Sequence, residues 1–117
     1  MGPFRLAVIL CAIAASTAQA AGSERGETLI RRHCGTCHAP GPQGTSPEPA
    51  APPLRELNRR YDPEMLSEAL GEGLLTGHPL MPEFRFEPED VEAILQYLRA
   101  IQTRQPAGNP GVPTGAR

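Results

Sequence analysis

The sequence predicts a small all-α domain of three to four helices. Apolar residues recur every three to four positions in several separate segments, and proline-rich stretches that cannot be helical connect these segments. The chain has 117 residues and no tryptophan. A domain of this size buries only a modest fraction of its surface, so we expect it to be reinforced by a metal or a covalent staple.

The first twenty residues are typical of a secretory signal peptide. Residues 1–5 carry one positive charge, residues 6–15 form an apolar run, and residues 18–20 spell AQA, with small residues where a signal peptidase cleaves. An apolar run of ten residues is too short for a membrane-spanning helix, which needs roughly 20. We therefore expect a signal peptide over 1–20, cleaved near Ala20, and a periplasmic mature chain without a membrane span. An uncleaved N-terminal anchor is the alternative.

The first helix of the mature chain is expected to begin at Ser23, whose hydroxyl can cap it, with Leu29 and Ile30 on one face. Gly26 lies on the same face, where a glycine costs about 1 kcal/mol relative to alanine. A glycine here makes sense if another helix crosses closely over it. Residues 39–53 hold six prolines and two glycines, which predicts an irregular loop.

Further helical segments are expected after this loop, beginning with a short turn over 54–57. Asp62 should cap the next helix, with Pro63 at its first position and Gly73 at its end. The last helix should begin at Pro88. Its apolar stripe consists of Val91, Ile94, Leu95, Leu98 and Ile101.

These segments predict one folded domain over residues 21–105. Residues 106–117 are rich in proline and glycine and have almost nothing to bury, so this tail is predicted to be disordered. The chain carries 11 basic residues, all of them arginine, against 13 acidic ones. A net charge of −2 excludes a generally basic nucleic-acid binder.

Residues 34–38 spell CGTCH, the attachment pattern of a c-type haem. A short turn can present the two sulfurs to the two vinyl groups on one side of a porphyrin, where they form thioethers. The residue after the second cysteine then lies under the ring centre, where an imidazole nitrogen can bind the iron. The motif therefore predicts one haem c held by Cys34 and Cys37, with His38 as an iron ligand.

Three other roles compete for these cysteines, because Cys11 would leave with the signal peptide. A disulfide between Cys34 and Cys37 would close almost no chain and would stabilise the fold very little. A thioredoxin-like redox pair normally belongs to a strand–helix unit, and no strand pattern surrounds the motif. A zinc site could add His38 with His33 or His78, but ligation by both flanking histidines would strain the loop. The pattern favours haem over these alternatives.

A haem that only shuttles electrons needs a second axial ligand. Met65, Met81, His33 and His78 are the candidates. Met81 is the best placed, because it lies between two helices in a stretch with a proline on either side. Such a stiff loop can aim a thioether at iron without a large loss of entropy.

Over roughly residues 22–102 the chain resembles the class I mono-haem c-type cytochromes. The matching features are Gly26 ahead of the CGTCH motif, the Pro53-Leu54 pair, the stretch from Met81 to Phe84, and Tyr97-Leu98 in the last helix. The resemblance implies a small cytochrome c fold, in which three to four helices wrap around one covalently bound haem. It also implies that Gly26 lies where the first helix crosses the last.

The resemblance assigns a role to each site residue. Cys34 and Cys37 would carry the thioethers. His38 would be the proximal iron ligand and Met81 the distal one. The carbonyl of Pro53 would accept a hydrogen bond from the second ring nitrogen of His38, with the adjacent Pro52 as the alternative. Many members dock partners through a ring of lysines, and this chain has none.

The expected function is single-electron transfer in the periplasm between redox partner proteins, a donor dehydrogenase and an acceptor oxidase. The chain would act as a monomer or a small subunit of a complex. We expect no enzymatic turnover, because the spacing indicates no acid–base pair or nucleophile beside the haem. Two alternatives stay open: a cytochrome subunit held in a periplasmic dehydrogenase, and a haem-based ligand-binding or sensing protein with an open sixth position.

Overall fold

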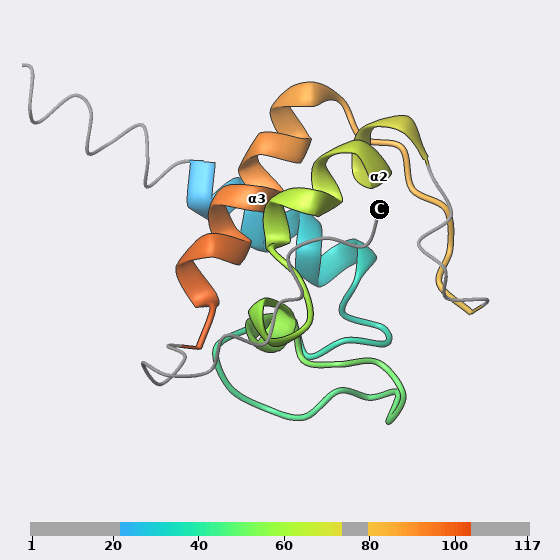
Figure 1. The fold of residues 1–117 in the computed structure, drawn as a ribbon, viewed down its shortest axis with the longest axis vertical. Helices are drawn as coiled ribbons and strands as arrows, with labels where there is room; N and C mark the ends of the chain where they lie inside the picture. The colour runs from blue at the N-terminus through green and yellow to red at the C-terminus, as the bar shows by residue number, and fades with distance from the viewer. Residues whose placement is uncertain (1–21, 74–79, 104–117) are drawn as a thin grey trace, which may run out of the picture.

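The computed structural model describes residues 22–73 and 80–103. This part of the chain consists of helices joined by turns and irregular segments, without a strand, which is the predicted all-α fold (Figure 1). An N-terminal helix covers residues 22–33. The later elements are the 3-10 helices η1 (Leu54–Arg59) and η2 (Pro63–Met65) and the α-helices α2 (Leu66–Glu72) and α3 (Pro88–Ile101).

Both ends of the sequence lie outside the described residues, so the predicted signal peptide over 1–20 and tail over 106–117 stay predictions. None of the helices described is long and apolar enough to cross a membrane.

The N-terminal helix crosses α3 at Gly26. A Cβ at this position would overlap the carbonyl oxygen of Ala93 and would come within 2.9 Å of the Cβ of Tyr97. Only glycine lets the two backbones approach this closely, which confirms the expected crossing. The expected cap at Ser23 is wrong, because the helix already includes residue 22 and Ser23 lies inside it.

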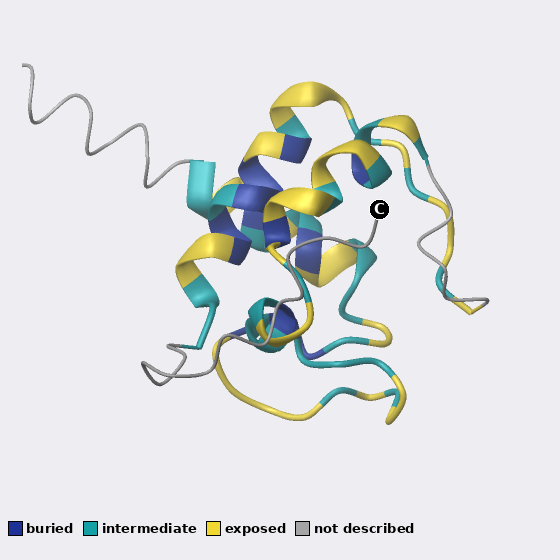
Figure 2. Ribbon diagram, viewed as in Figure 1, coloured by how far each residue is buried: buried dark blue, intermediate teal, exposed yellow. Residues whose placement is uncertain are grey.

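The core lies where α3 packs on α2 and the N-terminal helix, and Figure 2 shows the buried residues gathered there. The predicted stripe of α3 is buried apart from its last member, Ile101, which is half-buried. Tyr97 is also buried, because it stands over the glycine crossing. The buried members of the cluster are Ile30, Leu54, Leu57, Leu70, Val91, Ile94, Leu95, Tyr97 and Leu98.

The second helical region begins and ends at the predicted residues. The carboxylate of Asp62 accepts a hydrogen bond from the backbone N–H of Glu64, and Pro63 occupies the first position. The first turn is a 3-10 turn, which continues directly into α2. Gly73 ends α2 in the left-handed conformation, with φ of 72°, as a helix-terminating glycine does.

Residues 39–53 form the predicted irregular loop, and η1 follows at the predicted place. Two contacts hold the beginning of this loop against the helices. The hydroxyl of Tyr97 donates to the carbonyl of Pro40 at 3.1 Å. The N–H of Leu54 donates to the carbonyl of Ala39 at 3.1 Å, which brings the two ends of the loop together.

Candidate functional site

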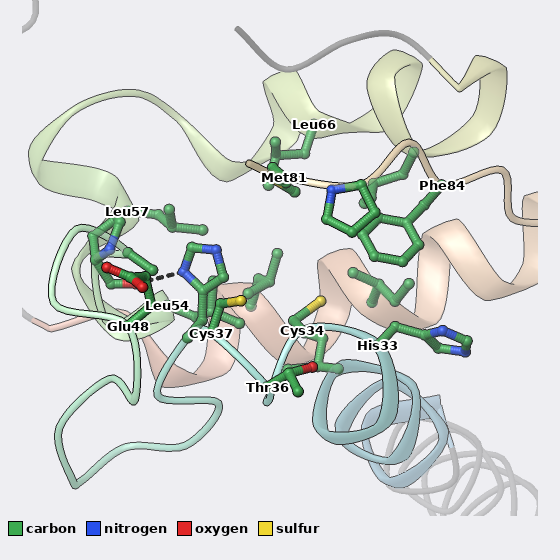
Figure 3. Close-up of a pocket in the computed structure, with 18 of the residues that line it drawn as sticks. His33, Cys34, Thr36, Cys37, Glu48, Leu54, Leu57, Leu66, Met81 and Phe84 are labelled. Carbon is green, nitrogen blue, oxygen red and sulfur yellow. Dashed lines mark hydrogen bonds between the residues drawn. The ribbon is translucent and has the colours of Figure 1, made fainter. Parts of the chain in front are cut away.

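An apolar cavity of about 280 Å³ lies between the helices and the irregular segments (Figure 3). The N-terminal helix, the 39–53 loop, η1, α2, α3 and the stretch after residue 79 all contribute side chains to its wall. Cys34, Cys37, His38 and Met81 all line it. The fold therefore brings these four residues together in one cavity.

Residues 34–38, here called the cysteine turn, continue the N-terminal helix by one turn. The N–H of Cys34 donates to the carbonyl of Ile30 at 2.8 Å, and the N–H of His38 donates to the carbonyl of Cys34 at 2.9 Å. In Figure 3 the sulfurs of Cys34 and Cys37 point into the same space. The turn thus presents both sulfurs to one cavity, as attachment to a single ring needs.

The two thiols have different surroundings. Cys34 is partly buried and Cys37 is exposed, and no disulfide joins them. Burial raises the pKa of the Cys34 thiol to about 11. This thiol therefore stays neutral at neutral pH. The environment of Cys34 suits an uncharged thioether better than a reactive thiolate.

The zinc alternative would need several closely spaced ligands. Within the described ranges, no three His, Cys, Asp or Glu side chains gather closely enough to hold a metal ion. Structural zinc needs four such ligands. His78, one of the residues considered for this role, lies outside the described residues.

His38 is oriented by a backbone carbonyl. Its Nδ1 lies 2.7 Å from the carbonyl oxygen of Pro52, drawn as a dashed line in Figure 3. Because a carbonyl oxygen can only accept, Nδ1 carries the hydrogen, and the lone pair of Nε2 is left for a metal. Such a bond fixes the ring and raises its basicity as a ligand.

The prediction of Pro53 as the partner of His38 is wrong by one residue. The carbonyl of Pro53 instead accepts a hydrogen bond from the N–H of Glu56 at 3.0 Å, the first bond of η1. Pro52 was the alternative considered from the sequence, and its carbonyl is the one that His38 contacts.

The candidates for the second axial ligand differ in where they lie relative to the cavity. Met81 lines the cavity and in Figure 3 lies across from the two cysteine sulfurs. Met65 is 70% exposed and contributes nothing to the cavity wall. The ring of His33 packs edge-on against the rings of Phe84 and Phe86. Of the two methionines considered, Met81 is therefore the one that lines the cavity.

Sequence reasoning missed Glu48, which lines the same cavity. Its N–H donates to the carbonyl of Cys37 at 3.1 Å, and its carboxylate accepts from the N–H of Ala50 at 3.1 Å. No spacing rule could place it, because it lies in the irregular loop and reaches the cavity only when that loop folds back over the cysteine turn.

The residues present fit a haem. Two neighbouring sulfurs, an imidazole that can offer Nε2 and a thioether across an apolar cavity are the donors that a covalently attached, six-coordinate haem requires. Apolar walls also suit a flat ring that is largely hydrocarbon.

Comparisons with known proteins agree with this geometry. The model of the family described as "Cytochrome C oxidase, cbb3-type, subunit III" matches residues 21–98. Cytochrome c-552 of Bradyrhizobium diazoefficiens is 34% identical over 95 residues, covering 79% of this chain and 89% of that protein. No solved structure was found to match the chain significantly. The chain therefore belongs to the c-type cytochromes, the proteins that carry covalently bound haem c.

Proposed function

We propose that this chain is a periplasmic carrier of single electrons, with one haem c bound through Cys34 and Cys37 and with His38 and Met81 as axial ligands. Export by a signal peptide over 1–20 would leave a cytochrome domain over 21–105. The observation that carries the proposal is the convergence of these four residues on one apolar cavity.

Each part of the site has a role in this proposal. Haem c supplies the one-electron chemistry when it is bound. The carbonyl of Pro52 holds the proton of His38 on Nδ1 and keeps Nε2 available as a ligand. Met81 offers a soft thioether, which favours the ferrous state and raises the reduction potential above that of a bis-histidine site.

The apolar wall of the cavity should also raise the reduction potential. Side chains such as Ile30, Leu57 and Leu70 lie in the cavity wall and are buried. A wall of this kind excludes water and disfavours the additional positive charge of the ferric state. We therefore infer a reduction potential in the range suited to exchange with respiratory partners rather than with very low-potential donors.

Replacement of Met81 tests the proposal. In the exported, haem-loaded protein, Met81→Ala should lower the potential in a potentiometric titration followed by visible spectra, and should let carbon monoxide bind the reduced form. Met65→Ala is the matched control, because Met65 is exposed and lies away from the cavity, and it should change neither property. An unchanged spectrum and unchanged carbon monoxide reactivity in Met81→Ala would show that Met81 is not a ligand.

A subunit role is the second candidate, and the family description favours it. That family is named for a subunit of a cbb3-type oxidase. This chain would then pass electrons within an oxidase assembly, or within a dehydrogenase, instead of diffusing between partners. Size-exclusion chromatography of the native protein separates these cases, because a free carrier elutes at the size of one small domain. Carbon monoxide binding by the unmutated protein would instead support a sensing role with an open sixth position.

A further inference from the structure

We propose that His33 is a positioning residue for Met81, and that its ring locks the chain around Met81 against the haem cavity. The inference rests on the proposed function, in which Met81 is an iron ligand. It concerns residues 80–87, here called the methionine segment, which form no helix. A ligand carried by such a segment is held only as firmly as the contacts that tie the segment to the helices.

The rings of His33, Phe84 and Phe86 form one cluster. The His33 ring centre lies 5.9 Å from that of Phe84 at an interplanar angle of 74°, and 5.2 Å from that of Phe86 at 81°. The two phenylalanine rings stack on each other with centres 5.7 Å apart. Edge-to-face contacts at these distances are the favourable arrangement for aromatic rings.

Two hydrogen bonds tie the far half of the methionine segment to α2. The N–H of Phe86 donates to the carbonyl of Leu70 at 2.8 Å. The guanidinium of Arg85 donates to the carbonyl of Glu72 at 3.0 Å. The ring of His33 adds a link to a different element, the N-terminal helix, and this link is made by Phe84, three residues after Met81.

The place of His33 in the chain gives this link its effect. His33 is the last residue of the N-terminal helix and directly precedes Cys34. Its backbone therefore moves with the cysteine turn, which carries the sulfurs and His38. By packing against Phe84 and Phe86, the His33 ring couples the position of Met81 to the wall on which the haem is fastened.

The consequence can be measured by competition. An external ligand such as imidazole must displace Met81 from ferric iron, so its apparent affinity reports how firmly the methionine segment is held. Removing two edge-on ring contacts should destabilise the state in which Met81 is bound to iron by about 1.4 kcal/mol. This corresponds to about tenfold tighter imidazole binding.

The experiment is an imidazole titration of the ferric, haem-loaded protein, followed by the weak red absorption band that an iron–methionine bond produces. His33→Ala should bind imidazole about tenfold more tightly than the unmutated protein. His33→Phe keeps a flat ring at the same place and should restore weak binding. Arg32→Ala is the matched control, because Arg32 is the exposed neighbour of His33, and it should leave the affinity unchanged.

The outcomes separate the two proposals. If the unmutated protein lacks the iron–methionine band, ligation by Met81 fails and the role of His33 fails with it. If the band is present but His33→Ala binds imidazole as weakly as the unmutated protein, the positioning role alone is overturned. Should His33→Ala fail to fold, Phe84→Leu removes the same contact from the other side, and an unchanged affinity in that variant would equally overturn the proposal.

Discussion

The two walls of the cavity are built in different ways. The cysteine turn is held by main-chain hydrogen bonds within a few residues, and Cys34 and Gly35 both donate to the carbonyl of Ile30. The methionine segment forms no helix, and it is tied by ring contacts and hydrogen bonds to residues distant in sequence. One wall is therefore set locally, whereas the other depends on tertiary packing.

This difference predicts two kinds of failure. Changes in the cysteine turn should abolish attachment of the haem, because the turn supplies the bonds themselves. Changes around the methionine segment should leave attachment intact and alter how easily Met81 is displaced. The variants below test whether the two walls can be perturbed separately.

The largest effect should follow from replacing both sulfurs. Cys34→Ser combined with Cys37→Ser should release the haem in acid–organic extraction, because no covalent bond then remains. Cys11→Ser is the control, since Cys11 lies in the predicted signal peptide and should leave attachment intact. Haem that stays with the double variant after extraction would refute attachment through these cysteines.

Gly26→Ala should destabilise the crossing of the N-terminal helix and α3, and with it the whole fold. The added Cβ would overlap the carbonyl oxygen of Ala93, which is backbone and cannot rotate away. We expect the free energy of unfolding to fall by about 2–3 kcal/mol in a denaturant titration.

Gly71→Ala is the matched control for the helix crossing. Gly71 lies in α2, and its Cβ would meet only the side chain of Val91 in α3 at 3.9 Å, an ordinary contact. Alanine is also the better helix former, so this variant should gain about 0.5–1 kcal/mol. Equal effects of the two substitutions would contradict the close crossing at Gly26.

Gly73→Ala should perturb the methionine wall selectively. Its φ of 72° is strained for alanine, and the Cβ would lie 2.7 Å from the Glu83 carboxylate and 3.4 Å from the Phe84 carbonyl. We expect a loss of about 1–2 kcal/mol in stability, together with weaker Met81 ligation. Gly44→Ala shares the positive φ but has open space around it, so it should lose stability without changing the iron–methionine band. If the iron–methionine band weakened in both Gly73→Ala and Gly44→Ala, the effect would not be specific to the methionine segment.

The smallest effect is expected at the loop beside the cysteine turn. Tyr97→Phe removes the hydrogen bond to Pro40 and should cost about 1 kcal/mol at neutral pH, with Met81 ligation unchanged. A change in the iron–methionine band in this variant would show that the two walls are coupled through α3.

The same variant has a pH dependence with a definite sign. Burial raises the pKa of Tyr97, and the nearby charge of Glu27 acts in the same direction. A raised pKa in the folded state gives stability that is present below the ordinary tyrosine pKa and is lost as pH rises through the raised value. The stability difference between the unmutated protein and the Tyr97→Phe variant should therefore shrink in alkaline solution, as denaturant titrations at neutral and alkaline pH can show.

Local patterns in the sequence were sufficient for much of this protein. The CGTCH motif indicated the cofactor, Gly26 indicated a close helix crossing, and Gly73 marked the end of α2, because each depends on a few neighbouring residues. Tertiary structure decided the rest. Pro52 and Pro53 offer adjacent carbonyls, and the choice between them depends on η1, whose first hydrogen bond occupies Pro53.

The ligand candidates teach the same lesson. The flanking prolines favoured Met81 over Met65, but only the fold showed that Met65 faces solvent whereas Met81 lines the cavity. The contact of His33 with Phe84 joins residues about fifty positions apart, and no local pattern encodes it. Short-range hydrogen bonding and helix geometry can be read from the order of residues. Contacts between distant segments arise only when burial of the apolar faces brings those segments together.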